Sequence, residues 1–422
     1  MFGRLITNLT PDLRPFRESR DYRLLTAGAL ITGLGTQASL VALPYQVYVS
    51  THKPVLVGLL GLVELAPLVC ASLFGGALAD RYDRRRLLLL YQLLLVAVAG
   101  ALAAASFLGT PPLWLLYVLA GALAGSGQLE RVARASIVPN VVRPEHMRPA
   151  ISNMFGLMQL TMVVGPGLGG LLIAAFDVQA AYTVDAVSCI GMAFAAAAMS
   201  PQPPIGAEHE PVLRSIASGL RFVSGERALM GSFAIDLVAM SFGMPRALFP
   251  VMAVSLYHAG AAGTGALYAA VSIGATVAAL TTGWLGRARW LGRIVIGAVI
   301  AWGVAIALAG IMPSLFLAAL LLAVAGAADS VSAVCRSTIS QTLTPDRMRG
   351  RMSSVFSLVV AGGPRLGDVE AGSVASLAST RISVTSGGLA CLAGVAVIMV
   401  AFPELAGYDG DAAEARMVAV TA

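Results

Sequence analysis

Long apolar stretches recur along the whole chain, separated by short segments that carry the charged residues. A helix needs about 20 residues to cross the hydrocarbon core of a bilayer, so each stretch predicts a membrane-spanning helix. The pattern predicts twelve crossings, at residues 24–49, 55–79, 87–108, 113–133, 149–175, 178–199, 228–256, 263–286, 293–311, 314–337, 351–378 and 382–402. The charge-free run from Leu87 to Leu129 is too long for one crossing, and Gly109-Thr110-Pro111-Pro112 predicts the turn that divides it.

The arginine residues that fall between these stretches lie in alternate loops, whereas the intervening loops carry only Lys53 and Arg381. Short loops rich in Lys and Arg stay on the cytoplasmic side, so both termini are predicted to be cytoplasmic. The long connection divides the chain into four parts: a six-helix bundle at 1–199, a cytoplasmic linker with a short amphipathic helix at 200–227, a second six-helix bundle at 228–403 and a cytoplasmic tail at 404–422.

Composition excludes a soluble enzyme, because 57% of the residues are hydrophobic and only 12% are charged. Soluble chains carry about 25% charged residues. The four cysteines lack paired spacing, so neither a disulfide framework nor a metal site is predicted. The phosphate-loop pattern of glycine, four residues, glycine and lysine is missing from the sequence, which argues against ATP as the energy source. We expect a multi-pass protein of the inner membrane, with no cofactor and no nucleic-acid partner.

An internal repeat relates the two halves. The segment from Arg134 to Phe155 matches the segment from Arg336 to Phe356, with arginine, isoleucine, proline, acidic, methionine, serine and phenylalanine positions in the same order. Further on, Gly165-Pro166 matches Gly363-Pro364. An offset of six spans gives both halves the same orientation, as in transporters built from parallel repeats. The predicted fold is all-α, with twelve transmembrane helices in two pseudo-symmetric six-helix bundles.

The segment from Gly76 to Arg86, between spans two and three, resembles the signature loop of the major facilitator superfamily. That loop has glycine, three residues, aspartate, a basic residue, any residue, a second glycine and further basic residues. Asp83 replaces the second glycine here. This acidic residue, the Arg134 segment and the overall layout are most similar to the subgroup that contains the enterobactin exporter and related multidrug efflux proteins.

The resemblance implies roles for the charged residues of this loop. In the family, the aspartate equivalent to Asp80 faces the start of span eleven, where a helix N-terminus favours an anion. Neighbouring basic residues bridge helix ends, and such contacts latch the gate if they differ between two states. The residues expected to act in gating are Gly76, Asp80, Arg81, Arg84, Arg85 and Arg134.

Acidic residues inside predicted spans are candidates for proton coupling. A charge in the membrane costs at least about 2.5–3.5 kcal/mol on insertion scales, so it is expected to be paired or functional. The resemblance implies that span two packs beside span eleven across the interface of the halves. Glu64 and Arg365 lie about 14 and 9 Å from the outer boundary at 1.5 Å per residue, so we expect an ion pair between them across that interface. The proton-coupling candidates are Asp236, Asp329, Glu64 and Asp368. Asp236 and Asp329 are favoured because the family lines its cavity with spans one, four, seven and ten.

Span five contains Gly165, Pro166, Gly169 and Gly170, which match the glycine-proline pattern linked with exporters and antiporters. Proline removes a backbone hydrogen bond and glycine permits close helix packing, so tight packing alone predicts the same residues. Candidates for the substrate cavity are Gln37, Met158 and Arg246.

The leading hypothesis is a proton-coupled exporter of a small amphipathic compound, such as a drug or a siderophore-like molecule, working by alternating access. Its partners are the substrate, protons and the lipid bilayer, and a monomer is expected. Two alternatives stay open: a proton-coupled importer of a metabolite, and a membrane sensor that transports nothing.

Overall fold

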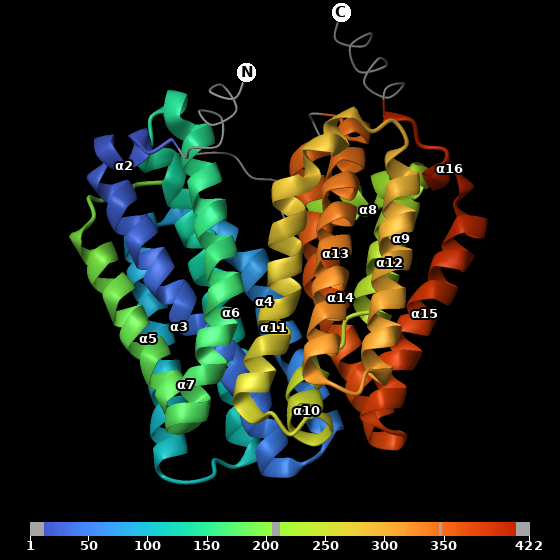
Figure 1. Cartoon of the computed structure of the whole chain (residues 1–422). Helices are drawn as coiled ribbons and strands as arrows, with labels where there is room; N and C mark the ends of the chain where they lie inside the picture. Colours follow the sequence, from blue (N-terminus) through green and yellow to red (C-terminus); the bar gives the residue numbers. More distant parts are fainter. Residues whose placement is uncertain (1–11, 205–211, 346–347, 411–422) are drawn as a thin grey trace, which may run out of the picture. The chain divides into compact units, whose positions relative to one another are not determined.

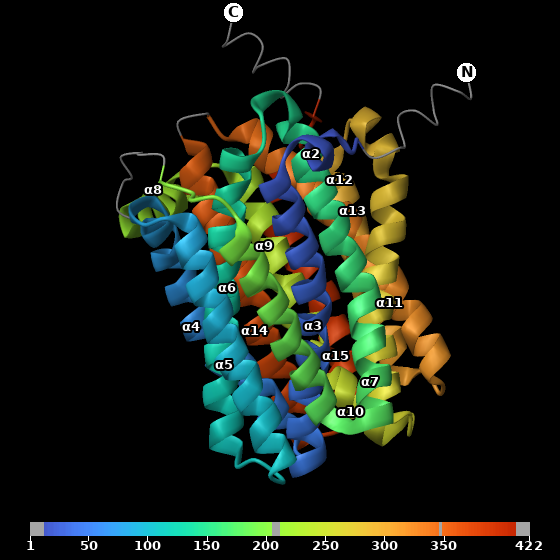
Figure 2. The same ribbon diagram turned by 90° about the vertical axis from the view of Figure 1, so that its left-hand side faces the viewer.

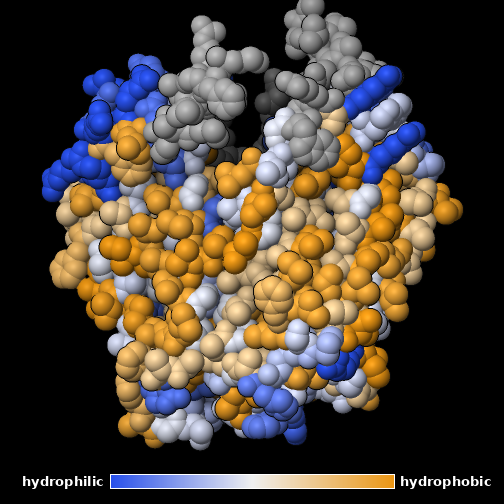
Figure 3. Space-filling view, in the orientation of Figure 1, coloured by the Kyte–Doolittle hydropathy of each residue, from blue (hydrophilic) through white to orange (hydrophobic). Residues whose placement is uncertain are grey.

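The structure is a computed structural model that describes residues 12–204, 212–345 and 348–410. Its described residues form helices joined by short turns (Figure 1). Helices are expected here because hydrocarbon offers no hydrogen-bond partner, so each segment must satisfy its own backbone. Nine helices in the described ranges are long and apolar enough to cross a membrane. On the face in Figure 3, apolar side chains cover the helix flanks and strongly polar ones gather towards the helix ends.

Each of the twelve predicted crossings falls on a helical segment. The first half of the chain contains α2 (Arg14–Glu18), α3 (Arg20–Thr51), α4 (Pro54–Arg81), α5 (Arg84–Phe107), α6 (Leu113–Val141), η1 (Pro144–His146) and α7 (Met147–Ala198). The predicted turn after span three is confirmed, because Gly109 adopts a φ of +133° between α5 and α6. Spans five and six form the two arms of α7, which a non-helical residue, Asp177 (φ 63°), divides.

The second half contains α8 (Val212–Gly225), α9 (Arg227–Phe242), η2 (Arg246–Leu248), α10 (Phe249–Val251), η3 (Met252–Leu256), α11 (Gly260–Thr281), η4 (Thr282–Arg287), α12 (Leu291–Ile311), α13 (Leu315–Leu343), α14 (Arg349–Leu377), α15 (Thr380–Ala401) and α16 (Pro403–Ala406). Span seven is therefore an interrupted helix, since α9 ends at Phe242 and short helical turns continue it.

The described contacts divide the chain into two compact units. The first comprises Met1–Ala42 and Cys70–Glu208, and the second comprises Leu43–Val69 and His209–Ala422. In the first unit α5 lies against α6 and α7 (Figure 1, Figure 2). A buried cluster near the arginine-rich helix ends includes Tyr22, whose hydroxyl donates to the Ala150 carbonyl at 2.9 Å.

The placement of Leu43–Val69 differs from the sequence prediction, which assigned all of 1–199 to one bundle. Glycine explains this grouping, because Gly58 and Gly61 bring α4 against the backbone of α14. A Cβ added at Gly58 would lie 2.4 Å from the Asp368 carbonyl oxygen, and one at Gly61 would lie 2.9 Å from the Arg365 carbonyl oxygen.

The predicted tail at 404–422 also differs in its first part. Leu405 is fully buried and Tyr408 is nearly so. Arg289 pairs with Asp409 at 2.8 Å, and the Gly410 amide donates to the Arg289 carbonyl at 2.9 Å. Residues 403–410 therefore pack on the second unit. The rest of the predicted tail, 411–422, lies outside the described residues.

Within the second unit, glycines set the closest helix approaches. A Cβ at Gly274 of α11 would lie 1.7 Å from the Ala323 carbonyl oxygen of α13, and one at Gly326 of α13 would lie 2.0 Å from the Val271 carbonyl oxygen. These two helices thus pack backbone to backbone, as small residues allow between membrane helices.

We expect Gly274→Ala to destabilise the protein, because a methyl group has no space against the α13 backbone and overpacking costs about 1–3 kcal/mol. Thermal unfolding of the purified protein in detergent measures the change. Gly297→Ala on α12 is the matched control, since its Cβ would meet no described heavy atom within 4 Å. Equal unfolding temperatures for the two variants would contradict the packing argument.

Candidate functional site

Two carboxylates and an arginine meet inside the second unit, on α9 and α13. Arg336 contacts Asp236 directly, and its Nη2 lies 3.5 Å from Asp329 Oδ1. The side chains of Arg336 and Asp236 are 9% and 4% exposed, whereas that of Asp329 is 33% exposed. The structure thus brings together the two carboxylates that the sequence singled out, and places an arginine between them.

Sequence reasoning missed the role of Arg336, which it used only as the repeat counterpart of Arg134. A signal was present, because Arg336 lies inside the predicted span 314–337 and an arginine there needs a counter-ion. The rotation of each helix about its axis decides which carboxylate that counter-ion is, and a span prediction leaves this rotation open.

A second charged cluster joins α4 and α14 in the same unit. Arg365 Nη2 lies 2.7 Å from Glu64 Oε2, and Arg365 Nη1 lies 3.7 Å from Asp368 Oδ2. Asp368 Oδ1 also accepts a hydrogen bond from the backbone amide of Ala247 at 3.1 Å. The structure therefore brings Glu64 and Arg365 together, as expected from the sequence, and Asp368 also lies next to Arg365.

Arg246 lies on η2 in the same unit, next to Ala247, whose backbone amide donates to Asp368 Oδ1 at 3.1 Å. Its side chain is exposed. The two clusters and Arg246 together comprise three arginines and four carboxyl groups. We call this set the charge chain: Asp236, Arg336, Asp329, Arg246, Asp368, Arg365 and Glu64.

In the first unit, the signature loop ties helix ends together. Asp83 is the N-cap of α5, and its Oδ1 accepts from the Arg85 amide at 2.9 Å and the Arg86 amide at 3.3 Å. Capping explains why an aspartate stands where the family pattern has its second glycine. The Asp83 carboxylate also accepts from the Gln202 amide at 3.3 Å, which fixes the chain that leaves α7.

The arginines of this loop bind helix carbonyls. Arg84 is 7% exposed and donates to the Ser136 carbonyl at 2.8 Å and to Asn140 Oδ1 at 2.9 Å, both on α6. Arg85 donates to the carbonyls of Ala196, at 3.0 Å, and Ala197, at the end of α7. Both arginines thus neutralise the negative ends of neighbouring helices.

The remaining gating candidates, Gly76, Asp80 and Arg81, lie in the last turns of α4. Asp80 is half-buried at the end of α4 and Arg81 is exposed. A Cβ at Gly76 would meet no described atom within 4 Å. The predicted target of Asp80, at the start of span eleven, includes Arg347 and the side chains of 349–351 and 353–358, which lie outside the described residues.

The arginines related by the internal repeat have different surroundings. Arg134 Nε lies 3.4 Å from Glu130 Oε1 one turn earlier on α6, and its side chain is 23% exposed. Arg336 instead reaches across to α9. The duplicated arginine is therefore a local pair in the first unit and an interhelical one in the second.

The glycine-proline segment of α7 packs on α3. A Cβ at Gly165 would lie 2.5 Å from Gln37 Cβ, and one at Gly169 would lie 2.8 Å from Ala38 Cα. Pro166 and Gly170 are buried beside them, whereas Met158 is 42% exposed. The equivalent glycines of α14 pack on α9, since a Cβ at Gly367 would lie 2.5 Å from the Met240 carbonyl oxygen. Close helix packing accounts for this motif.

Asp185, on the second arm of α7, is a buried carboxyl group in the first unit. It is 1% exposed, and its Oδ1 accepts from Thr36 Oγ1 of α3 at 3.2 Å. Its Oδ2 has no hydrogen-bond partner among the described residues.

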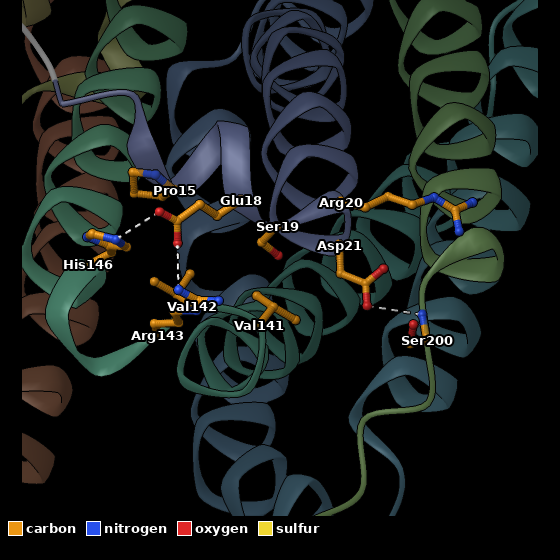
Figure 4. Close-up of a pocket in the computed structure, with 10 residues that line it drawn as sticks. All are labelled: Pro15, Glu18, Ser19, Arg20, Asp21, Val141, Val142, Arg143, His146 and Ser200. Atoms are coloured by element: carbon orange, nitrogen blue, oxygen red, sulfur yellow. Dashed lines mark hydrogen bonds and ion pairs between the residues drawn. The ribbon is translucent and has the colours of Figure 1, made fainter.

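A polar cavity of about 300 Å³ lies in the first unit, between the starts of α2 and α3 and the loop before α7 (Figure 4). Glu18 in this cavity accepts from His146 Nε2 at 3.2 Å and lies 3.6 Å from Arg143 Nη1. Asp21 Oδ2 accepts from the Ser200 amide at 3.2 Å. This cavity could not be predicted from the sequence, because its residues come from segments that only the fold brings together.

Solved structures with the same fold are membrane transporters. A POT family transporter in complex with 5-aminolevulinic acid has a TM-score of 0.71 at 13% identity, over 92% of this chain and 97% of that one. A bacterial homologue of the iron transporter ferroportin, in the inward-facing state, has a TM-score of 0.66 at 18% identity, over 92% and 98%. These likenesses show that the chain has the multi-pass α-helical fold of those structures.

Sequence comparison gives the particular family. The transmembrane secretion effector model matches residues 10–419, so the chain belongs to that family of the major facilitator superfamily. The enterobactin exporter EntS of Shigella boydii serotype 4 is 29% identical over 85% of this chain and 86% of its own length. The Citrobacter koseri EntS is 28% identical over 86% and 88%.

Removal of Arg84 should destabilise the first unit. Arg84→Gln leaves the part-buried Ser136 carbonyl and Asn140 Oδ1 on α6 without their donor, which costs about 1 kcal/mol. Arg86→Gln is the control, because Arg86 is the exposed neighbour in the same loop. Thermal unfolding in detergent compares the two, and a loss of stability in Arg86→Gln as large as in Arg84→Gln would refute the carbonyl-binding role.

Arg336 can be tested by a double substitution. Arg336→Gln leaves Asp236 as an uncompensated buried charge, at a cost of about 3–5 kcal/mol. Adding Asp236→Asn removes that charge, so the double variant should recover most of the folded yield measured by size-exclusion chromatography. Arg134→Gln, which breaks only a pair within one helix, should have a smaller effect. A double variant less stable than Arg336→Gln alone would show that the pair is not the cause.

Proposed function

We propose that this protein is a proton-coupled exporter of a small amphipathic, siderophore-like compound. The observation that carries the proposal is the charge chain, in which four carboxyl groups face three guanidinium groups. With every group ionised, one negative charge remains, and binding of one proton neutralises the set. The family and its enterobactin-exporting relatives support export as the direction. No covalent chemistry takes place.

Asp329 is the residue of the charge chain that takes up the proton. Asp236 is almost fully buried and in direct contact with Arg336, whereas Asp329 is more exposed and lies farther from the same arginine. Glu64 and Asp368 remain candidates, but both are paired with Arg365, and Asp368 also accepts from a backbone amide. A pair in contact resists protonation more strongly than a carboxylate that holds its counter-ion loosely.

The remaining residues have supporting roles. Arg84 and Arg85 hold the helix ends of the first unit as one body, and Asp80, Arg81 and Gly76 form the part of the gate that changes between two states. Arg134 steadies α6, and Gln37, Met158 and Arg246 line the path of the compound. The arginine-rich loops face the cytoplasm with both termini, and the protein works as a monomer in the inner membrane.

Export can be measured with inside-out membrane vesicles and enterobactin as the probe. An acidic lumen should drive accumulation of enterobactin, because protons leaving the lumen exchange for the compound. An importer would instead accumulate its compound in right-side-out vesicles placed in acidic medium. A sensor would accumulate nothing under either gradient, which would refute the proposal.

Asp329→Asn should reduce gradient-driven accumulation to the level of vesicles without the protein. The reason is that an amide side chain cannot take up and release a proton as a carboxyl group does. Binding of enterobactin to the purified variant should persist. Asp329→Glu keeps the titrating group and should retain part of the flux. Full gradient-driven flux in Asp329→Asn would exclude Asp329 as the coupling residue.

A further inference from the structure

A row of hydroxyl groups joins α3 to the second arm of α7 in the first unit. Thr32 Oγ1 donates to the Ser188 carbonyl at 3.1 Å, and Thr36 Oγ1 donates to Asp185 Oδ1 at 3.2 Å. Thr32, Thr36 and Ser39 follow one another at spacings of four and three residues, so they lie on one face of α3. This face of α3 therefore packs against α7 around a single carboxyl group (Figure 2).

The Asp185 carboxyl group has no positively charged partner. It is 1% exposed, and among the described residues no arginine, lysine or histidine lies within 4 Å of it. Besides Thr36, its other side-chain neighbour is the thiol of Cys189, with the sulfur 3.8 Å from Oδ1. An ionised carboxylate in such a place costs several kcal/mol, because one hydroxyl group replaces a full shell of water. A neutral, protonated carboxyl group avoids this cost.

Two buried oxygens in this contact are left without a partner. They are Asp185 Oδ2 and the hydroxyl oxygen of Ser39, a residue that is fully buried. Ser39 lies one turn beyond Thr36, and residues three apart on a helix are neighbours on its surface. A carboxylate oxygen can only accept, whereas a protonated carboxyl group can also donate. A proton on Oδ2 therefore supplies the donor that the Ser39 oxygen lacks.

The α3 helix has a flexible point just after these hydroxyl groups. Pro44 lies inside the helix and has no backbone N–H, so the carbonyl four residues earlier lacks its helical partner. The same turn is where α3 passes from the first unit, which ends at Ala42, to the second, which begins at Leu43. A change in the direction of α3 at this point would move Ser39 and Thr36 away from Asp185.

We propose that Asp185 is a proton-exchange site of the first unit, which is protonated while α3 packs on it and releases the proton when α3 bends at Pro44. In the packed state Oδ2–H donates to Ser39 and Oδ1 accepts from Thr36. Bending withdraws both hydroxyl groups and admits water, which takes the proton and solvates the carboxylate. Higher pH therefore favours the bent state. The inference goes beyond the proposed function, which places a proton only in the charge chain.

Other titratable groups on the surrounding helices leave this exchange to Asp185. They are Tyr182 and Cys189 of α7, Tyr91 of α5, and Glu130, Arg131 and Arg134 of α6. Glu130 and Arg134 pair with each other at 3.4 Å, and Arg131 is exposed. On α3 the sequence has no charged residue between Arg23 and Thr51, and Arg23 lies about 20 Å before Thr36 at 1.5 Å per residue.

The test is infrared spectroscopy of the purified full chain in lipid nanodiscs at neutral pH. A protonated carboxyl group has a C=O stretching band that an ionised carboxylate lacks, and this band shifts when deuterium replaces the proton. Asp185→Asn should lose one such band relative to the parent. Asp177→Asn, which changes an exposed aspartate of the same helix, is the control and should lose a carboxylate band instead. In heavy water the Asp185 band of the parent should shift with time.

A proline variant tests the link between bending and exchange. Pro44→Ala restores the missing backbone N–H, so it should slow the deuterium shift of the Asp185 band about fivefold, as one added hydrogen bond predicts. Pro139→Ala changes a proline inside α6 and should exchange like the parent. Asp185→Asn should also keep the parent's unfolding temperature, because an amide then replaces a neutral group of the same shape.

Three results would overturn the inference: loss of a carboxylate band in Asp185→Asn, a higher unfolding temperature of that variant, which would reveal a buried charge in the parent, or parent-like exchange in Pro44→Ala. None of these readouts needs a proton gradient or an exported compound. A protonated, exchanging Asp185 in a chain that does not export enterobactin would refute the proposed function alone. Export by a chain whose Asp185 is ionised would refute the proton site alone.

Discussion

The cost of an uncompensated charge in hydrocarbon governs the second unit of this protein. Four helices and one helix break contribute charged side chains to it, four carboxyl groups and three arginines. Breaking one buried pair costs about 3–5 kcal/mol, while the whole stability of a domain is about 5–15 kcal/mol. The positions of α4, α9, α13 and α14 in this unit are therefore constrained by their charges as well as by their apolar faces.

Much of the fold could be predicted from the sequence because the membrane imposes a simple rule. A charge-free stretch of sufficient length must be a helix, and depth along a helix follows from residue number alone. Together with the helix adjacency that the family resemblance implies, that arithmetic paired Glu64 with Arg365. It could not pair Arg336 with Asp236, since that contact depends on how α9 and α13 are rotated. It also missed the grouping of Leu43–Val69 with the second unit, which depends on Gly58 and Gly61 meeting the α14 backbone.

The two halves retain a common packing rule but have different electrostatics. Gly165 and Gly169 let α7 approach α3, and Gly363 and Gly367 let α14 approach α9 in the same way. Their buried carboxyl groups differ, because Asp185 in the first unit has hydroxyl and thiol neighbours where the second unit supplies arginines. The repeat thus fixes the backbone arrangement twice, whereas the charge chain belongs to one unit.

The charge chain contains both ion pairs in direct contact and charged residues with looser contacts. Asp236 with Arg336, and Glu64 with Arg365, are pairs in contact whose loss leaves a charge buried. Arg246 is exposed and Asp329 lies 3.5 Å from Arg336, so both are less tightly held than these pairs. Trp302, Tyr268 and Asp368 hold the backbone around Arg246. A transporter needs charges that can change partners without loss of the fold. In the proposed mechanism, the pairs in contact supply the stability that this exchange requires while Asp329 takes up and releases the proton.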